Sequence, residues 1–170
     1  HLSFAIWNGF FGPSFGADLD ALSFHSIAVE YAEIPTSEIF RIGWIYSYFL
    51  GIFYSITIGH IFLGSLLSCI AWTLSALVLL KILDLLAVND RNKYLALLIY
   101  TILPSSLLYT SVTLREVYQL LFINIAIYSS LMILIRRSLA HWVLFFLGII
   151  GAGILHGALL VFGILLTTLT

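Results

Sequence analysis

The sequence predicts an all-α, polytopic integral membrane protein with about four or five transmembrane helices and one amphipathic helix beside the membrane. Of the 170 residues, 62% are hydrophobic and only 9% are charged, and the mean hydropathy is +1.12. A soluble domain usually carries about a quarter charged residues. Several apolar runs also reach the roughly 20 residues that one crossing requires.

Residues 1–40 are expected to form an outer-face loop that contains the amphipathic helix, at about 19–33. Apolar residues recur there at helical spacing: Phe24, Ile27, Ala28 and Tyr31. Polar residues recur three or four apart on the other side: Asp20, Ser23, Ser26, Glu30 and Glu33. This pattern is typical of a helix lying on a membrane surface.

Residues 43–58, "GWIYSYFLGIFYSITI", are short for a crossing. They carry Trp44, Tyr46, Tyr48 and Tyr54, the amphipathic aromatics that favour the membrane interface. We expect a juxtamembrane or re-entrant helix here.

Four stretches are predicted to cross the membrane: 61–83, 94–112, 117–135 and 140–169. Pro104, within the second, predicts a kink or an early end of that helix. The last stretch is long enough for one tilted helix or for a helix that breaks near Gly151, Gly153 or Gly157. Residues 1–170 are expected to form a single membrane domain.

Basic residues in short loops predict the orientation, because such loops stay cytoplasmic. Lys81, Arg91 and Lys93 surround one loop, and Arg136 and Arg137 form the next basic loop two crossings later. The turn between them, with Arg115 and Glu116, then faces outward. Residues 1–40 share that outer face when 43–58 does not cross.

Two other observations narrow the class of protein. The net charge of −1 and the lack of a long basic run remove the electrostatic basis for nucleic-acid binding. The single cysteine, Cys69, lies in an apolar run and is expected to pack there. Since the chain starts at His1 and ends on the apolar "GILLTTLT", it is expected to be a fragment, with further helices on either side.

Four of the eight acidic residues lie between residues 16 and 33. Asp18 and Asp20 follow a Gly- and Pro-containing turn and stand near His25. They suit either a helix cap or a general base, and spacing alone does not separate these roles. Glu30 and Glu33 are expected to be solvated.

Arg115 and Glu116 follow the Ser/Thr-rich stretch "LPSSLLYTSVTLREVYQ". They suit an interfacial ion pair, a snorkelling arginine, or a site where Arg115 holds a phosphate and Glu116 orients a partner or a metal. His156, within an apolar run, suits a hydrogen-bonded packing residue or a ligand or proton carrier, and His25 has the same alternatives.

Together, "GADLDALSFHSIA" and "SVTLREV" resemble the two acidic outer-loop motifs of the GT-C superfamily of membrane glycosyltransferases, which includes protein mannosyltransferases and the lipid A aminoarabinose transferase. The separation of about a hundred residues between the motifs is also similar. The sequence departs from the family pattern in three respects. The family's usual first transmembrane helix before the first motif is missing, many later helices and any distal domain are missing, and the second motif reads Arg-Glu where relatives often have an aspartate.

The resemblance implies transfer of a sugar from a polyprenyl-phosphate donor to a glycan, lipid or protein acceptor, with inversion, at the outer face of a bacterial inner membrane. Asp20, or Asp18, would be the catalytic base, and Arg115 and Glu116 would lie near the donor phosphate. Whether a divalent cation takes part stays open. The setting would be cell-envelope polysaccharide assembly.

Two other functions compete with this one. A non-catalytic membrane subunit would pack its small-residue faces, with Gly148, Gly151 and Gly153, against partner helices. A transporter would need polar groups near the bilayer midplane, where the sequence offers few beyond Asn124 and His156.

Overall fold

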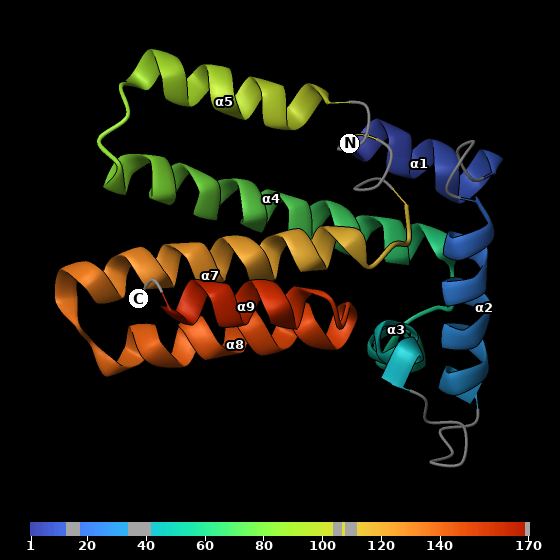
Figure 1. Ribbon diagram of the computed structural model, residues 1–170. Coiled ribbons are helices and arrows are strands. Elements are labelled where there is room, and N and C mark those ends of the chain that lie inside the picture. The colour runs from blue at the N-terminus through green and yellow to red at the C-terminus, as the bar shows by residue number, and fades with distance from the viewer. Residues whose placement is uncertain (13–17, 34–41, 104–106, 108–111, 169–170) are drawn as a thin grey trace. The chain divides into compact units, whose positions relative to one another are not determined.

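The computed structural model describes residues 1–12, 18–33, 42–103, 107 and 112–168. All regular elements in these ranges are helical, which confirms the all-α class (Figure 1). The chain divides into two compact units, His1–Ile70 with Pro104–Val117, and Ala71–Leu103 with Tyr118–Thr170. The elements are α1 (Leu2–Phe11), α2 (Asp18–Glu33), the 3-10 turn η2 (Ile42–Trp44), α3 (Ile45–Ile56), α4 (Ile61–Leu85), α5 (Asp90–Ile102), α7 (Glu116–Arg136), α8 (Leu139–Leu155) and α9 (Leu159–Thr168).

Among the described helices, α4 and α7 are the two that are long and apolar enough to cross a membrane. They have 25 and 21 residues. At 1.5 Å per residue these lengths correspond to roughly 37 and 31 Å, against a hydrocarbon core of about 30 Å. The predicted crossings 61–83 and 117–135 coincide with these two helices, whereas the other two predicted crossings differ from the structure.

The stretch predicted to cross at 94–112 is not one continuous helix. Helix α5 has 13 residues and ends at Ile102, and its C-cap Leu103 has extended backbone angles, φ −51° and ψ 128°. Leu103 precedes Pro104, whose ring disfavours the helical conformation of the residue before it. The early helix end is one of the two outcomes that Pro104 predicts, and 104–106 and 108–111 lie outside the described residues.

The stretch at 140–169 is a hairpin of two short helices and not a single tilted helix. Helices α8 and α9 lie side by side, joined by a turn at residues 156–158 (Figure 1). The turn falls at the last of the three glycines considered, Gly157. A Cβ on Gly163 would collide with Ile149, so the missing side chain lets α9 approach α8 closely.

In the first unit, α2 packs against α3. Ala28, Leu50 and Tyr54 form a buried cluster between them. A Cβ on Gly51 would come 2.9 Å from the main-chain oxygen of Ala28, so this glycine permits the close approach. The apolar stripe of α2 is therefore covered by protein, where a membrane surface had been expected.

Helix α1 occupies residues that were expected to be a loop. Its sequence, "LSFAIWNGFF", is apolar on nearly all sides. Gly9 faces the start of α4, since a Cβ there would come 2.6 Å from Cβ of Phe62. Trp7 and Phe11 stack on each other with ring centroids 5.0 Å apart and stay exposed.

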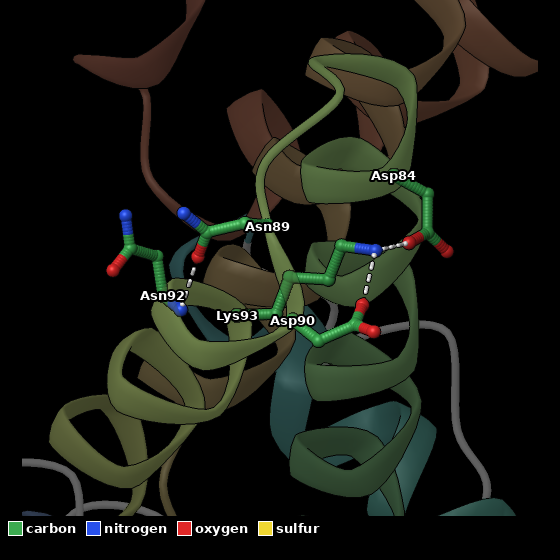
Figure 2. A network of polar contacts seen from close by, with 5 residues as sticks. All are labelled: Asp84, Asn89, Asp90, Asn92 and Lys93. Atoms are coloured by element: carbon green, nitrogen blue, oxygen red, sulfur yellow. Dashed lines mark hydrogen bonds and ion pairs between the residues drawn. The ribbon is translucent and has the colours of Figure 1, made fainter.

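In the second unit, a compact polar turn joins α4 to α5 (Figure 2). Asn89 caps α5 by accepting a hydrogen bond from the Asn92 main-chain N–H at 2.9 Å. The Lys93 ammonium binds Asp84 at the end of α4 at 2.6 Å and Asp90 at 3.2 Å. Ala87 adopts a positive φ of 53°, as in the left-handed residue that commonly ends a helix.

Candidate functional site

Arg115 lies over helix α2, close to the first acidic motif. Its guanidinium carbon is 5.7 Å from the centroid of the Phe24 ring. Val112 and Leu114, just before it, form a buried cluster with Ala21, and Phe24 packs against that cluster. Because Ala21 follows Asp20 directly and Phe24 is one helical turn after Asp20, the structure brings the two predicted motifs onto the same part of α2.

The pairing between Arg115 and Glu116 is loose. Arg115 Nε and Glu116 Oε1 are 3.8 Å apart, beyond hydrogen-bond distance. Arg115 Nε and Glu116 Oε2 are both shielded from solvent and have no hydrogen-bond partner among the described residues. A guanidinium carries five N–H donors, so Arg115 retains the capacity to bind an anion.

Asp20 projects from the first turn of α2 and is exposed. Since the helix begins at Asp18, Asp20 lies two residues inside it and is not the N-cap residue. Among the described residues it has no hydrogen bond or ion pair, so its carboxylate oxygens can accept a proton from a bound molecule. Asp18 is the first residue of the helix, and its side chain lies outside the described part of the chain.

His25 is engaged in the packing of α2 on α3. Its Nδ1 forms a hydrogen bond with the Tyr54 hydroxyl at 2.9 Å, and the two rings meet edge to face. Burial, followed by the nearby His60, lowers the pKa of His25, and burial raises the pKa of Tyr54. A neutral imidazole held by a protonated phenol fits the packing interpretation of His25 and leaves Asp20 as the better candidate base.

His156 lies in the turn between α8 and α9 and is exposed. Its main-chain N–H donates a hydrogen bond to the oxygen of Ala152 at 3.0 Å. The sequence suggested a hydrogen-bonded packing residue or a ligand or proton carrier, and both roles assumed that His156 lies inside an apolar helix. The structure places it in a turn, so that assumption is wrong. His156 belongs to the second unit, whereas Arg115 and Phe24 belong to the first.

Sequence reasoning missed the part that Phe24 plays in this site. Phe24 was expected only as a member of the apolar stripe, yet its ring lies below Arg115 and meets the Tyr46 ring at 90° with centroids 5.2 Å apart. An aromatic face attracts a guanidinium and orients it. The sequence does show an aromatic residue, Phe24, one turn after Asp20. Its contact with Arg115, 91 residues later, cannot be inferred from local spacing.

A second polar cluster, in the second unit, was also missed. Asn124 Nδ2 donates to Ser75 Oγ at 2.9 Å, and Ser75 Oγ shares a hydrogen bond with the Tyr100 hydroxyl at 2.8 Å. These residues join α7, α4 and α5. The network satisfies the polar groups of a largely apolar helix packing.

No group of three or more His, Cys, Asp or Glu side chains gathers within the described residues. Glu116, the predicted partner for a metal, has the Arg115 guanidinium beside it.

Comparison with known proteins gives no family assignment. No family model matches the chain, and neither a curated protein nor a solved structure is significantly similar to it.

Proposed function

We propose that the chain is a polytopic integral membrane protein of the bacterial inner membrane. Two observations support this proposal. The most apolar windows of α4 and α7 are only 33% buried, whereas a core helix of a soluble protein is mostly buried. Large apolar side chains are also exposed along α1, α5, α8 and α9, which is the expected surface of helices in contact with lipid.

We further propose that this protein is a GT-C-type glycosyltransferase, which moves a sugar from a polyprenyl-phosphate donor to a glycan, lipid or protein acceptor at the outer membrane face. One observation carries the proposal: Arg115, whose Nε has no hydrogen-bond partner among the described residues, lies over the ring of Phe24, which stands one helical turn after Asp20 on α2. A leaving phosphate needs nearby positive charge, and an acceptor hydroxyl needs a base.

In the proposed reaction, the acceptor oxygen attacks the anomeric carbon and its proton passes to the Asp20 carboxylate. The bond between the anomeric carbon and the phosphate oxygen breaks on the opposite face, and polyprenyl phosphate leaves with the bonding electrons. Arg115 stabilises the charge that develops on that phosphate, and Phe24 holds the guanidinium in place. Attack opposite the leaving group gives inversion.

The packing of α8 argues against the non-catalytic subunit as the main function. A Cβ on Gly148 would come 2.9 Å from the Ala126 main-chain nitrogen, and Gly151 and Gly153 face Phe122 and Leu160 of the same chain. The chain's own residues thus occupy the small-residue face that a partner subunit was expected to cover. Asn124 was one of the few polar groups available to a transporter pathway. Its amide donates a hydrogen bond to Ser75, which weakens the transporter hypothesis.

The binding step can be tested with the full chain in lipid nanodiscs. Polyprenyl phosphate and the uncharged polyprenol of equal length serve as probes, with binding measured by native mass spectrometry. We expect the wild type to prefer the phosphate. Arg115→Gln should lose about 10- to 100-fold of that preference, since a charge-assisted hydrogen bond contributes roughly 1.5–3 kcal/mol. Arg137→Gln, which removes an exposed charge elsewhere, is the matched control.

Asp20→Asn separates chemistry from binding. This variant should bind polyprenyl phosphate as the wild type does and should release none from a polyprenyl-phosphate sugar. Equal binding of the phosphate and the alcohol by the wild type, or an equal effect of Arg137→Gln, would contradict the proposed site.

A further inference from the structure

One face of α5 borders a shallow, open hollow of about 570 Å³. This volume is within the range of sites for small organic ligands, roughly 300–1,000 Å³. The lining residues all come from α5: Arg91, Tyr94, Leu95, Leu97, Leu98 and Thr101. Most of them recur at spacings of three and four, so a single stripe of the helix forms the lining, with its cation at the N-terminal end.

The cation of this stripe, Arg91, is unpaired within the described residues. Arg91 is exposed and makes no ion pair or hydrogen bond within the part of the chain that the structure describes. Lys93, two residues later, is held between Asp84 and Asp90, as Figure 2 shows. Asp90 therefore directs its carboxylate to Lys93, and the positive charge at the start of the hollow is that of Arg91.

The rest of the stripe is apolar and uncovered. Tyr94 is 72% exposed, and Leu95 and Leu98 are each 53% exposed. Tyrosine favours the level of the lipid headgroups, whereas leucine favours the hydrocarbon below it. The order along α5 is thus guanidinium, phenol and aliphatic side chains, which is the order of polarity in a phospholipid from its phosphate to its acyl chain.

We propose that this face of α5 binds an anionic glycerophospholipid, with its phosphate at Arg91 and one acyl chain along Tyr94, Leu95 and Leu98. A guanidinium donates two parallel hydrogen bonds to a phosphate, and the acyl chain makes van der Waals contacts along the exposed leucine side chains. Arg91 stands just after the α4–α5 turn, which the positions of the basic residues predict to be cytoplasmic, and the cytoplasmic leaflet is anionic. The inference rests on the proposed membrane location and uses no residue of the Arg115 cluster.

The test uses the full chain in neutral detergent and measures lipid binding by native mass spectrometry. Phosphatidylglycerol and phosphatidylcholine with identical acyl chains are the probes, and soluble glycerol phosphate serves as the headgroup without chains. We expect the wild type to prefer phosphatidylglycerol by about tenfold, consistent with one charge-assisted contact. Arg91→Gln should abolish the preference, and Arg91→Lys should retain part of it.

Two matched controls separate the site from general surface effects. Arg137→Gln removes an exposed charge outside the hollow and should keep the preference. Leu98→Asn should weaken the binding of both phospholipids. Leu144→Asn, at an exposed leucine of α8, should leave the binding of both unchanged. Circular dichroism is used to check that each variant stays helical.

The proposal would be overturned if Arg91→Gln and Arg137→Gln lost the preference for phosphatidylglycerol equally. Equal binding of the two phospholipids by the wild type would also overturn it. Competition by glycerol phosphate as strong as that by phosphatidylglycerol would overturn the part assigned to the leucines. The result is independent of the proposed transferase: Arg91→Gln should keep the preference for polyprenyl phosphate over polyprenol, and Arg115→Gln should keep the preference for phosphatidylglycerol.

Discussion

The Thr113 hydroxyl donates a hydrogen bond to the main-chain oxygen of Ile61 at 3.2 Å, although 52 residues separate the two in sequence. Gly64, one turn later, leaves room for the Thr113 side chain, which a Cβ there would meet at 2.6 Å. This contact fastens the segment before Arg115 to the first turn of α4. In the proposed topology, the beginning of α4 and Arg115 therefore lie on the same side of the membrane.

The contact of His25 with Tyr54 predicts a pH dependence of stability. Burial lowers the pKa of folded His25 below the ordinary value of about 6.5 for histidine. The unfolded chain therefore binds more protons as the pH falls past 6.5, and the stabilisation present above that value is lost as the pH falls through the folded pKa. We expect the thermal midpoint of the wild type to fall between about pH 7 and pH 5.

His25→Gln should flatten this pH profile. His141→Gln, which replaces a histidine of the second unit, is the control and should keep the wild-type slope. Identical slopes for wild type and His25→Gln would show that the α2–α3 contact does not depend on this imidazole.

The packing of α8 on α7 predicts a sharp difference between two glycines. A Cβ on Gly148 would come 2.9 Å from both the Ala126 nitrogen and the Phe122 oxygen, which are main-chain atoms that cannot rotate away. Gly148→Ala should therefore lower the free energy of unfolding by about 1–3 kcal/mol, as overpacking does. Gly157→Ala, where no atom lies within 4 Å of the added Cβ, should be nearly neutral. Equal midpoints in thermal unfolding would contradict this account of the α7–α8 contact.

The Ser75–Tyr100 hydrogen bond predicts energetic coupling between α4 and α5. A double-mutant cycle with Ser75→Ala and Tyr100→Phe should give a coupling free energy of about 0.6 kcal/mol, the average for polar pairs between membrane helices. The control cycle combines Tyr100→Phe with Ser129→Ala. Ser129 is a buried serine whose hydroxyl has no hydrogen-bond partner among the described residues. A coupling near zero in the first cycle would mean that the 2.8 Å contact contributes nothing to stability.

Local patterns were sufficient for several helices and insufficient for others. The end of α5 before Pro104 follows from the steric effect of a proline ring on the preceding residue. The turn at residues 156–158 was not located, because three glycines offered equivalent breaks and two of them, Gly151 and Gly153, are occupied in helix packing. Apolar periodicity also predicted that one side of α2 is covered, but it does not distinguish lipid from α3 as the cover.

The candidate site shows the same limit. Asp20 and Arg115 could be selected from the sequence because carboxylates and guanidinium groups are rare in so apolar a chain. The stacking of Arg115 on Phe24 could not be selected, because it depends on how Val112 and Leu114 pack against Ala21. Long-range packing of this kind leaves no periodic signal in a single sequence.

The side of the membrane on which α2 lies is the most direct test of outer-face sugar transfer. In a Cys69→Ser background, single cysteines replace Ser26, exposed on α2, and Leu86, which is 57% exposed in the α4–α5 turn. Sealed vesicles of known orientation are then treated with a membrane-impermeant thiol reagent. We predict labelling of Ser26→Cys from outside and of Leu86→Cys only after permeabilisation. Labelling of Ser26→Cys only from the inside would place Asp20 and Arg115 in the cytoplasm and contradict the proposed reaction.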